Sequence, residues 1–151
     1  MGNPTPQDFV NMRVAIEEAE ESLRTGGIPI GAALFRGTEL LGKGHNQRVQ
    51  LENPILHGET DCLQNVGRIG SYRGTTMYST LMPCFMCGGT IVQFRIPRLV
   101  VGEARSFPGS GEFMESHGVE VVDLGMEKCS SMMSRFIEEH PQLWAEDIGE
   151  L

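Results

Sequence analysis

Two short segments constrain this chain more than any other: His57-Gly58-Glu59 and, further along, Pro83-Cys84-Phe85-Met86-Cys87. One imidazole and two thiolates with these spacings are typical ligands of zinc, so the fold is expected to bring the two segments together. Cysteines three residues apart in one helical turn lie on the same side and can share an ion. With no fourth protein ligand in evidence, one coordination position remains for water, as in catalytic zinc sites.

The pattern of apolar residues predicts alternating helices and strands. A strand that begins at Glu39 is expected to end at Gly42-Lys43-Gly44, and residues 45–55 are expected to form an irregular connection. This alternation indicates an α/β fold with a mixed sheet covered by helices on both faces. We expect helices at 6–25, 57–66, 84–94, 113–116, 126–140 and 141–149, and strands at 30–35, 39–41, 75–80, 98–102 and 119–122.

Length and charge narrow the class of protein. A chain of 151 residues is expected to form a single domain, residues 1–151, and to bury its core without disulfides. The formal net charge of −8 argues against a nucleic-acid partner, because such binding relies on Lys and Arg. No apolar run reaches the roughly 18 residues of a membrane span. The polar N-terminus lacks the apolar core of a signal peptide, so a cytoplasmic protein without a membrane partner is expected.

Two further cysteines, Cys62 and Cys129, stand apart from the metal-type pair. We interpret both as reduced, buried, small hydrophobic residues. Cys62 follows His57 by five positions on the same predicted helix, and a helix turns those two side chains apart. Cys62 is therefore not expected to be a fourth ligand.

The ligand segments also indicate a reaction. Each opens a predicted helix, and the positive end of a helix stabilises thiolates. A zinc-bound water ionises near neutral pH, and Glu59, held off the metal, is suited to accept its proton. Glu59 would pass this proton to a ring nitrogen and later protonate a leaving amine, so the expected chemistry is hydrolytic deamination of an amidine-like carbon. Taken singly, His57 also fits a core histidine, and the cysteine pair a redox motif or half of a structural zinc site.

The order His-x-Glu and then Pro-Cys-x-x-Cys is the signature of zinc nucleobase and nucleoside deaminases. Beyond this motif the chain resembles the fungal-type cytosine deaminases, small homodimeric zinc enzymes of the cytidine-deaminase-like fold. The resemblance covers nearly the whole chain. It is carried by residues 26–31, 44–46, 56–59, 65–68, 83–87, 100–103 and 144–150, of which the tail and Gly58, where most relatives have alanine, are the specific parts.

The resemblance implies a three-layer α/β/α sandwich with a five-stranded mixed sheet. It also implies a homodimer that binds a small-molecule nucleobase and a Zn²⁺ cofactor, and that converts cytosine to uracil and ammonia. The implied site residues are His57, Cys84 and Cys87 as metal ligands, Glu59 as proton shuttle, Asn46, the Gly58 N–H and Asp147 as hydrogen-bonding groups, and Phe107 and Trp144 as an apolar lid.

Other interpretations remain open at this point. Asn46 lies in a Gly-rich loop and also suits the capping of a turn, whereas Asp147 in an acidic tail also suits a solvated charge. Phe107 and Trp144 also suit the core. Ala145 replaces an aromatic residue of the fungal enzymes, which would enlarge the pocket for another amino-heterocycle such as a substituted cytosine, isocytosine, guanine or creatinine. A tRNA or polynucleotide deaminase and a zinc-stabilised interaction domain are the remaining alternatives.

Overall fold

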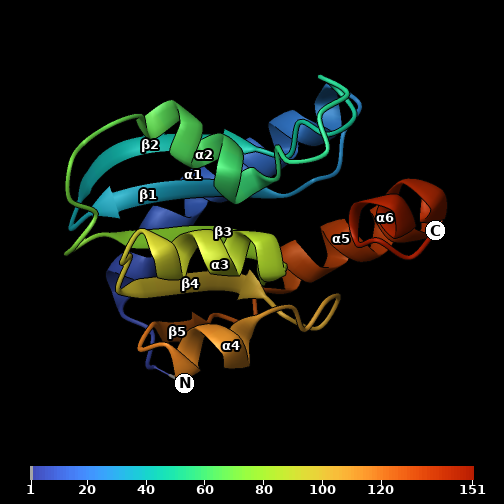
Figure 1. Cartoon of the computed structure of the whole chain (residues 1–151). Coiled ribbons are helices and arrows are strands. Elements are labelled where there is room, and N and C mark those ends of the chain that lie inside the picture. Colours follow the sequence, from blue (N-terminus) through green and yellow to red (C-terminus); the bar gives the residue numbers. More distant parts are fainter. Residues whose placement is uncertain (1) are drawn as a thin grey trace.

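A computed structural model describes residues 2–151 and contains one five-stranded sheet with the strand order β2-β1-β3-β4-β5 (Figure 1). The central strand β3 has an antiparallel neighbour on one side and a parallel neighbour on the other. This mixed sheet is the one predicted from the sequence. Its strands are β1 (Gly31–Arg36), β2 (Glu39–His45), β3 (Thr76–Leu81), β4 (Arg98–Glu103) and β5 (Glu120–Asp123).

Helices cover both faces of the sheet, which confirms the predicted three-layer α/β/α sandwich. One face carries α1 (Pro6–Arg24) and α5 (Glu127–Glu139). The opposite face carries α2 (Gly58–Val66), α3 (Phe85–Gln93) and α4 (Gly111–Ser116). The last helix, α6 (Pro141–Asp147), lies beyond one end of the sheet (Figure 1).

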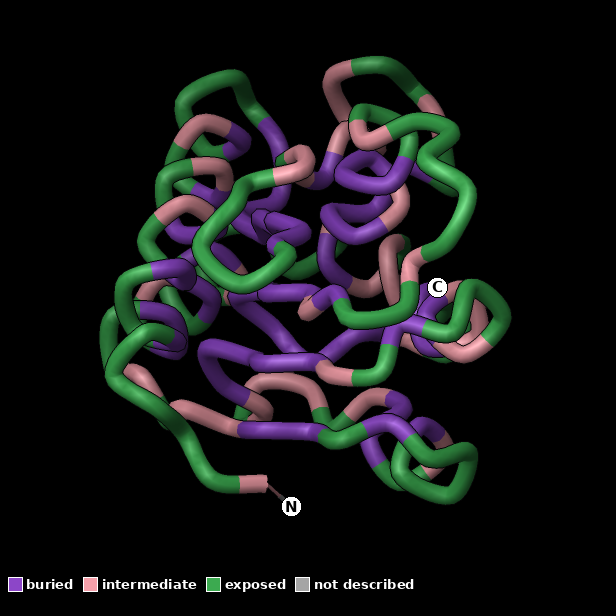
Figure 2. The backbone as a smooth tube through the Cα atoms, turned by 90° about the vertical axis from the view of Figure 1, so that its left-hand side faces the viewer, coloured by how far each residue is buried: buried purple, intermediate pink, exposed green. Residues whose placement is uncertain are grey.

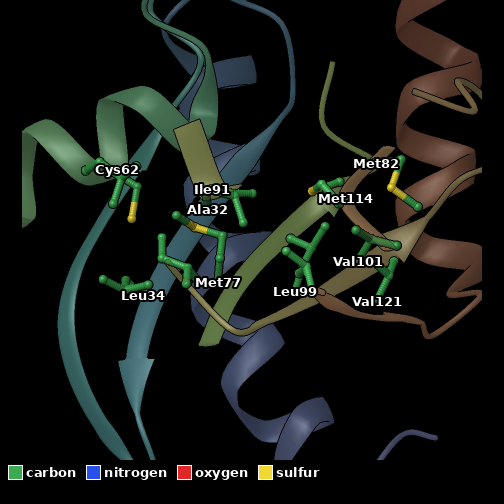
Figure 3. Packing of buried hydrophobic residues seen from close by; sticks show 13 residues of the cluster. Ala32, Leu34, Cys62, Met77, Met82, Ile91, Leu99, Val101, Met114 and Val121 are labelled. Atoms are coloured by element: carbon green, nitrogen blue, oxygen red, sulfur yellow. The ribbon is translucent and has the colours of Figure 1, made fainter. Parts of the chain in front are cut away.

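Side chains of each strand point alternately to the two faces. Successive residues of β1, β3 and β4 are nearly all buried, so both faces of this part of the sheet are covered. Figure 2 shows these buried residues along the backbone at the centre of the molecule. Ala32 and Leu34 of β1 pack on the α2/α3 side, whereas Ala33 and Phe35 pack against α1. Figure 3 shows the first of these clusters between the sheet and the helices, with Cys62 contributed by α2. A third cluster fills the end of the sheet beneath α6 and contains Ile28, Ile30, Leu81, Met133, Phe136 and Trp144.

The prediction that β2 ends at Gly42-Lys43-Gly44 was wrong, because the strand continues through these residues to His45. The glycines serve close packing of α2 on β2. A Cβ atom on Gly44 would lie 2.5 Å from the backbone N of Cys62, and one on Gly42 would lie 2.5 Å from Val66 Cγ2. These residues are therefore glycine because the helix lies almost on the strand backbone, and they do not interrupt the strand.

Helix α1 begins with a capping box that leads into a buried ion pair. The Thr5 hydroxyl accepts a hydrogen bond from the Asp8 N–H, and the Asp8 carboxylate accepts one from the Thr5 N–H. Asp8, 1% exposed, also binds Arg98 through two hydrogen bonds of 2.7 and 2.8 Å. Burial raises the pKa of Asp8, but the hydrogen bonds from Arg98, Thr5 and Tyr78 outweigh it and lower the pKa to about 2.

Among residues 2–151, no helix is long and apolar enough to cross a membrane.

Candidate metal centre and active site

The fold brings the two ligand segments together at the N-termini of two helices. His57 is the N-cap residue of α2, Cys84 is the N-cap residue of α3, and Cys87 lies in the first turn of α3. The ligand atoms of these three residues all lie within 4.8 Å of one another. His57 Nδ1 is 3.5 Å from Cys84 Sγ, so this ring nitrogen faces the cysteines.

The three side chains perturb one another electrostatically. A hydrogen bond from Cys87 lowers the pKa of Cys84 to about 4 against the effect of burial, and His57 adds to this. The same Cys84–Cys87 hydrogen bond, together with burial, raises the pKa of Cys87 well above its usual value. Burial lowers the pKa of His57, but its hydrogen bond to Cys84 and the charges of Asp147, Glu59 and Cys84 raise the pKa to about 9.

This set of donors fits zinc. Two sulfur atoms and one imidazole nitrogen converge, and both helix N-termini add positive partial charge that favours thiolates. In the described part of the chain, residues 2–151, no other residue joins this group of potential ligands. Cys62 is free and buried in the core, where its Sγ lies 3.5 Å from the Gly42 carbonyl oxygen, and Cys129 is also free and buried. The prediction that both are reduced core residues is confirmed.

Glu59 lies in the first turn of α2 and is 3% exposed. Burial raises the pKa of its carboxyl group, the Cys84 charge raises it further, and His57 opposes both, which gives a pKa of about 7. Its carboxyl group also shares a hydrogen bond with the Cys87 side chain. A carboxyl group with this pKa can both accept and donate a proton near neutral pH.

Glu59 lines a small cavity at the end of the sheet. The cavity offers about 20 Å³ to the centre of a water-sized sphere, which is room for about one water. Phe107 and Trp144 cover it, with ring centroids 5.8 Å apart and planes at 89°. Its polar residues are His57, Glu59, Cys84 and Asp147, and its apolar residues are Ile30, Leu81, Met82, Phe107, Trp144 and Ile148.

Asn46 and Asp147 meet beside this cavity. Asn46, 0% exposed, donates from Nδ2 to Asp147 Oδ1 at 3.2 Å and accepts from the Arg48 N–H at 3.0 Å through Oδ1. Asn46 therefore caps a turn and contacts Asp147, but it is not itself among the residues that line the cavity. Asp147 Oδ1 lies 3.4 Å from His57 Nε2, the ring nitrogen opposite the one that faces the cysteines. Burial raises the pKa of Asp147, while His57 and Asn46 act in the opposite direction.

Gly58 and Ala145 lie close to the cavity but are not among the residues that line it in the described structure. Gly58 is buried, and a Cβ atom there would lie 3.2 Å from the Ile30 carbonyl oxygen. Ala145 is half-buried and does not line this cavity.

Sequence reasoning missed several residues around the cavity. Ile30, Leu81 and Met82 lie at strand ends, and Met82 immediately precedes the Pro83 segment. Arg48 was also missed: its Nε lies 2.9 Å from Glu146 Oε2, which ties the loop after β2 to α6. Adjacency to a ligand segment was a signal for Met82, whereas the Arg48–Glu146 contact has no local signal in the sequence.

Comparison with known proteins identifies the family. The family model of the cytidine and deoxycytidylate deaminase zinc-binding region matches residues 6–103, so the chain belongs to this family. The matched region includes the three candidate ligands and Glu59 and ends before α6.

Individual relatives extend this result over nearly the whole chain. The chain is 43% identical over 149 residues to the cytosine deaminase of Candida albicans, covering 97% of this chain and 99% of that protein. It is 34% identical over 145 residues to the tRNA-specific adenosine deaminase of Bacillus subtilis, covering 88% and 90%. A guanine deaminase structure from Nitrosomonas europaea shares the fold, with a TM-score of 0.71, 17% identity and coverage of 90% and 86%.

Proposed function

We propose that this protein is a zinc-dependent hydrolase that deaminates a free nucleobase, and that its main substrate is cytosine, which it converts to uracil and ammonia. The observation that carries the proposal is the position of Glu59. Its buried carboxyl group lines the same cavity as the side chains of His57 and Cys84. The likeness to the Candida albicans cytosine deaminase over almost the full length supports cytosine as the substrate.

In this proposal His57, Cys84 and Cys87 hold the metal ion. When bound, zinc supplies Lewis-acid activation of a water molecule. Glu59 takes up one proton of this water and delivers it to the ring nitrogen next to the reacting carbon. It then takes the proton of the hydroxyl group that has been added to this carbon and delivers it to the amine, which leaves as ammonia while the carbonyl group forms. Each of these transfers requires a carboxyl group that lies beside the metal ligands without being one of them, and Glu59 has this position.

The substrate is oriented by groups from three separate segments. The Asn46 amide offers a donor and an acceptor to the carbonyl and N–H edge of the ring, and the Gly58 N–H adds a second donor. Asp147 accepts from the exocyclic amine. Phe107 and Trp144 pack over the ring and exclude water from the reacting carbon.

The position of the C-terminal segment beside the cavity favours a free base over a polynucleotide. Asp147, Trp144 and Ile148 all come from α6 or the residue after it, so the C-terminal segment forms a wall of the cavity. A nucleotide inside a strand would need an open path for its backbone on this side. The net charge of −8 also disfavours a polyanion.

A substrate panel tests the proposal. The zinc-loaded protein is given cytosine, isocytosine, guanine, creatinine, cytidine and a tRNA, and ammonia release is measured. We expect cytosine to give the largest kcat/KM and cytidine and tRNA to give no release above background. A larger kcat/KM for another free base would replace cytosine as the substrate, and inosine formation in the tRNA without ammonia release from any free base would reject the proposal.

We also propose that the protein works as a homodimer in the cytoplasm, where its four cysteines stay reduced. Phe85 and Met86 on α3 support the dimer, because they are 69% and 38% exposed in the single chain. Light scattering should give twice the chain mass of 16.6 kDa. A mass of one chain at micromolar concentration would reject the dimer.

A further inference from the structure

A buried carboxylate outside the cavity has no role in the chemistry described so far. Glu103 ends β4 and is 0% exposed. Its Oε2 accepts hydrogen bonds from the backbone N–H groups of Arg105 at 2.8 Å and Ser106 at 2.9 Å. Its Oε1 is buried and has no hydrogen-bond partner among the described residues.

This arrangement does not favour the stability of the folded protein. A buried carboxylate is stabilised only by its partners, and one oxygen of Glu103 has none. The guanidinium of Arg105 is directed elsewhere, to Glu127 at 3.0 Å and Ser130 at 2.6 Å. What the carboxylate does achieve is to hold two consecutive backbone N–H groups of the loop that follows it.

That loop, residues 104–110, covers the candidate active site. It carries Phe107, which lines the cavity and packs edge-to-face on Trp144. Its far end is fixed to the metal-ligand segment, because the Ser110 hydroxyl binds the carbonyl oxygens of Pro83 at 2.9 Å and Cys84 at 3.0 Å. The loop is therefore held at both ends, by Glu103 before Phe107 and by Ser110 after it.

We propose that Glu103 is a positioning residue for substrate binding. By accepting from two N–H groups, its carboxylate fixes the turn that presents Phe107 to Trp144 and to the ring of the substrate. Glu103 does not line the cavity, so it acts through the loop and not on the substrate. This inference rests on the proposed function of the cavity as the binding site of a free base.

Loss of the Glu103 carboxylate is expected to weaken substrate binding, because Phe107 would be less ordered before the substrate binds. When both N–H groups lose their acceptor, Phe107 is no longer held in the position that the substrate needs. The cost of ordering it is then paid when the substrate binds. Binding is weakened, whereas proton transfer by Glu59 after binding is nearly unchanged.

Trp144 provides a direct test, because it is the only tryptophan in the chain. Its emission is measured in the zinc-loaded protein without substrate, well below the melting temperature. In Glu103→Ala we expect a red-shifted emission and stronger quenching by acrylamide. In Glu103→Gln, which retains one acceptor oxygen, we expect emission close to that of the wild type. The surface variant Glu127→Gln, which removes a partner of Arg105 but leaves the Glu103 hydrogen bonds, should behave as the wild type.

Kinetics with the base that the wild type deaminates provide the second test. Glu103→Ala should raise KM by roughly tenfold, as expected for the loss of order in one large side chain, with kcat changed less than about threefold. If Glu103 acts through Phe107, the double variant Glu103→Ala/Phe107→Ala should have the KM of Phe107→Ala alone. Should Glu103→Ala fail to fold, Glu103→Asp replaces it, because the shorter side chain keeps the charge but does not reach both N–H groups.

Three results would overturn the proposal: unchanged Trp144 emission, KM effects that multiply in the double variant, or a Gln variant as impaired as the Ala variant. The fluorescence test needs no substrate. It therefore separates failure of this inference from failure of the proposed function, which would appear as a wild-type protein that deaminates no base.

Discussion

Asn46 donates a hydrogen bond to Asp147, 101 positions later in the sequence, at a distance of 3.2 Å. Both residues are expected to bind the substrate, and without it they bind each other. A base that enters must replace this hydrogen bond with its own polar groups. The binding free energy therefore depends on the hydrogen bonds that the base gains minus the Asn46–Asp147 hydrogen bond that is lost. A base whose polar groups do not replace this contact binds more weakly.

Asp147→Asn should weaken zinc binding as well as substrate binding. Asp147 lies 3.4 Å from His57 Nε2 and so orients the imidazole whose other nitrogen faces the cysteines. Loss of such an outer partner costs about 10-fold to 100-fold in metal affinity. Competition with a chromogenic chelator measures this affinity, and the variant Glu150→Gln, at an exposed acid beyond the end of α6, serves as the control. Equal zinc affinity in Asp147→Asn and the wild type would show that the contact does not orient His57.

Glu59→Gln should abolish turnover while zinc remains bound. Loss of the proton shuttle is expected to lower kcat by a factor of about 10² to 10⁴. The matched control is Asp61→Asn, a buried acid of the same helix that accepts from the His45 N–H at 3.0 Å and does not line the cavity. Metal content is measured by atomic absorption. Turnover by Glu59→Gln at more than a tenth of the wild-type rate would refute the acid–base role.

Arg48→Gln should loosen the C-terminal wall of the cavity with little loss of global stability. The Arg48–Glu146 pair is partly exposed, so its contribution to the free energy of unfolding is expected to be below about 1 kcal/mol. Because it joins the loop after β2 to α6, its loss should still increase acrylamide quenching of Trp144. Arg135→Gln, which removes an exposed ion pair with Glu139 within α5, is the control and should leave quenching unchanged. Equal quenching in both variants would argue against this contact as a closure of the site.

Asp8→Asn should destabilise the protein at neutral pH more than at acid pH. The pKa of Asp8 is lowered from 3.8 to about 2 in the folded state, so its ionised form stabilises the fold fully above pH 3.8. This contribution, roughly 2 kcal/mol, is lost as the pH falls from about 4 towards 2. Urea unfolding of wild type and variant at pH 7 and pH 3 measures the difference, and release of zinc in acid affects both proteins alike. A difference that grows on acidification would contradict the Asp8–Arg98 assignment.

Much of this molecule was predictable because its signals are local. The cap at Thr5 and the glycines after α1 predict the first helix, and the Pro83 segment predicts α3 with Cys84 and Cys87 at its start. The continuation of β2 through Gly42 and Gly44 was not predictable in this way. In a local reading glycine indicates a break, and only the packing of α2 on the strand shows why these residues lack side chains.

The candidate site also contains some contacts that were predictable from the sequence and others that were not. The proximity of His57 to Cys84 follows from the chemistry of a shared ion, which overrides their separation in the sequence. Two other contacts depend on how the loops at the end of the sheet pack in the folded chain. They are the Arg48–Glu146 ion pair and the hydrogen bonds of Glu103 to residues 105 and 106. No spacing rule encodes such contacts, so they emerge only from the folded chain.

The position of the ligands on two separate helices has a consequence for folding itself. An ion held by His57 and Cys87 would act as a cross-link that closes a loop of 30 residues (87 − 57), with β3 inside it. Like a disulfide, such a tether stabilises chiefly by reducing the entropy of the unfolded chain. The four cysteines of this chain form no disulfide. Metal binding would therefore stabilise its fold in the way that a disulfide stabilises a secreted domain.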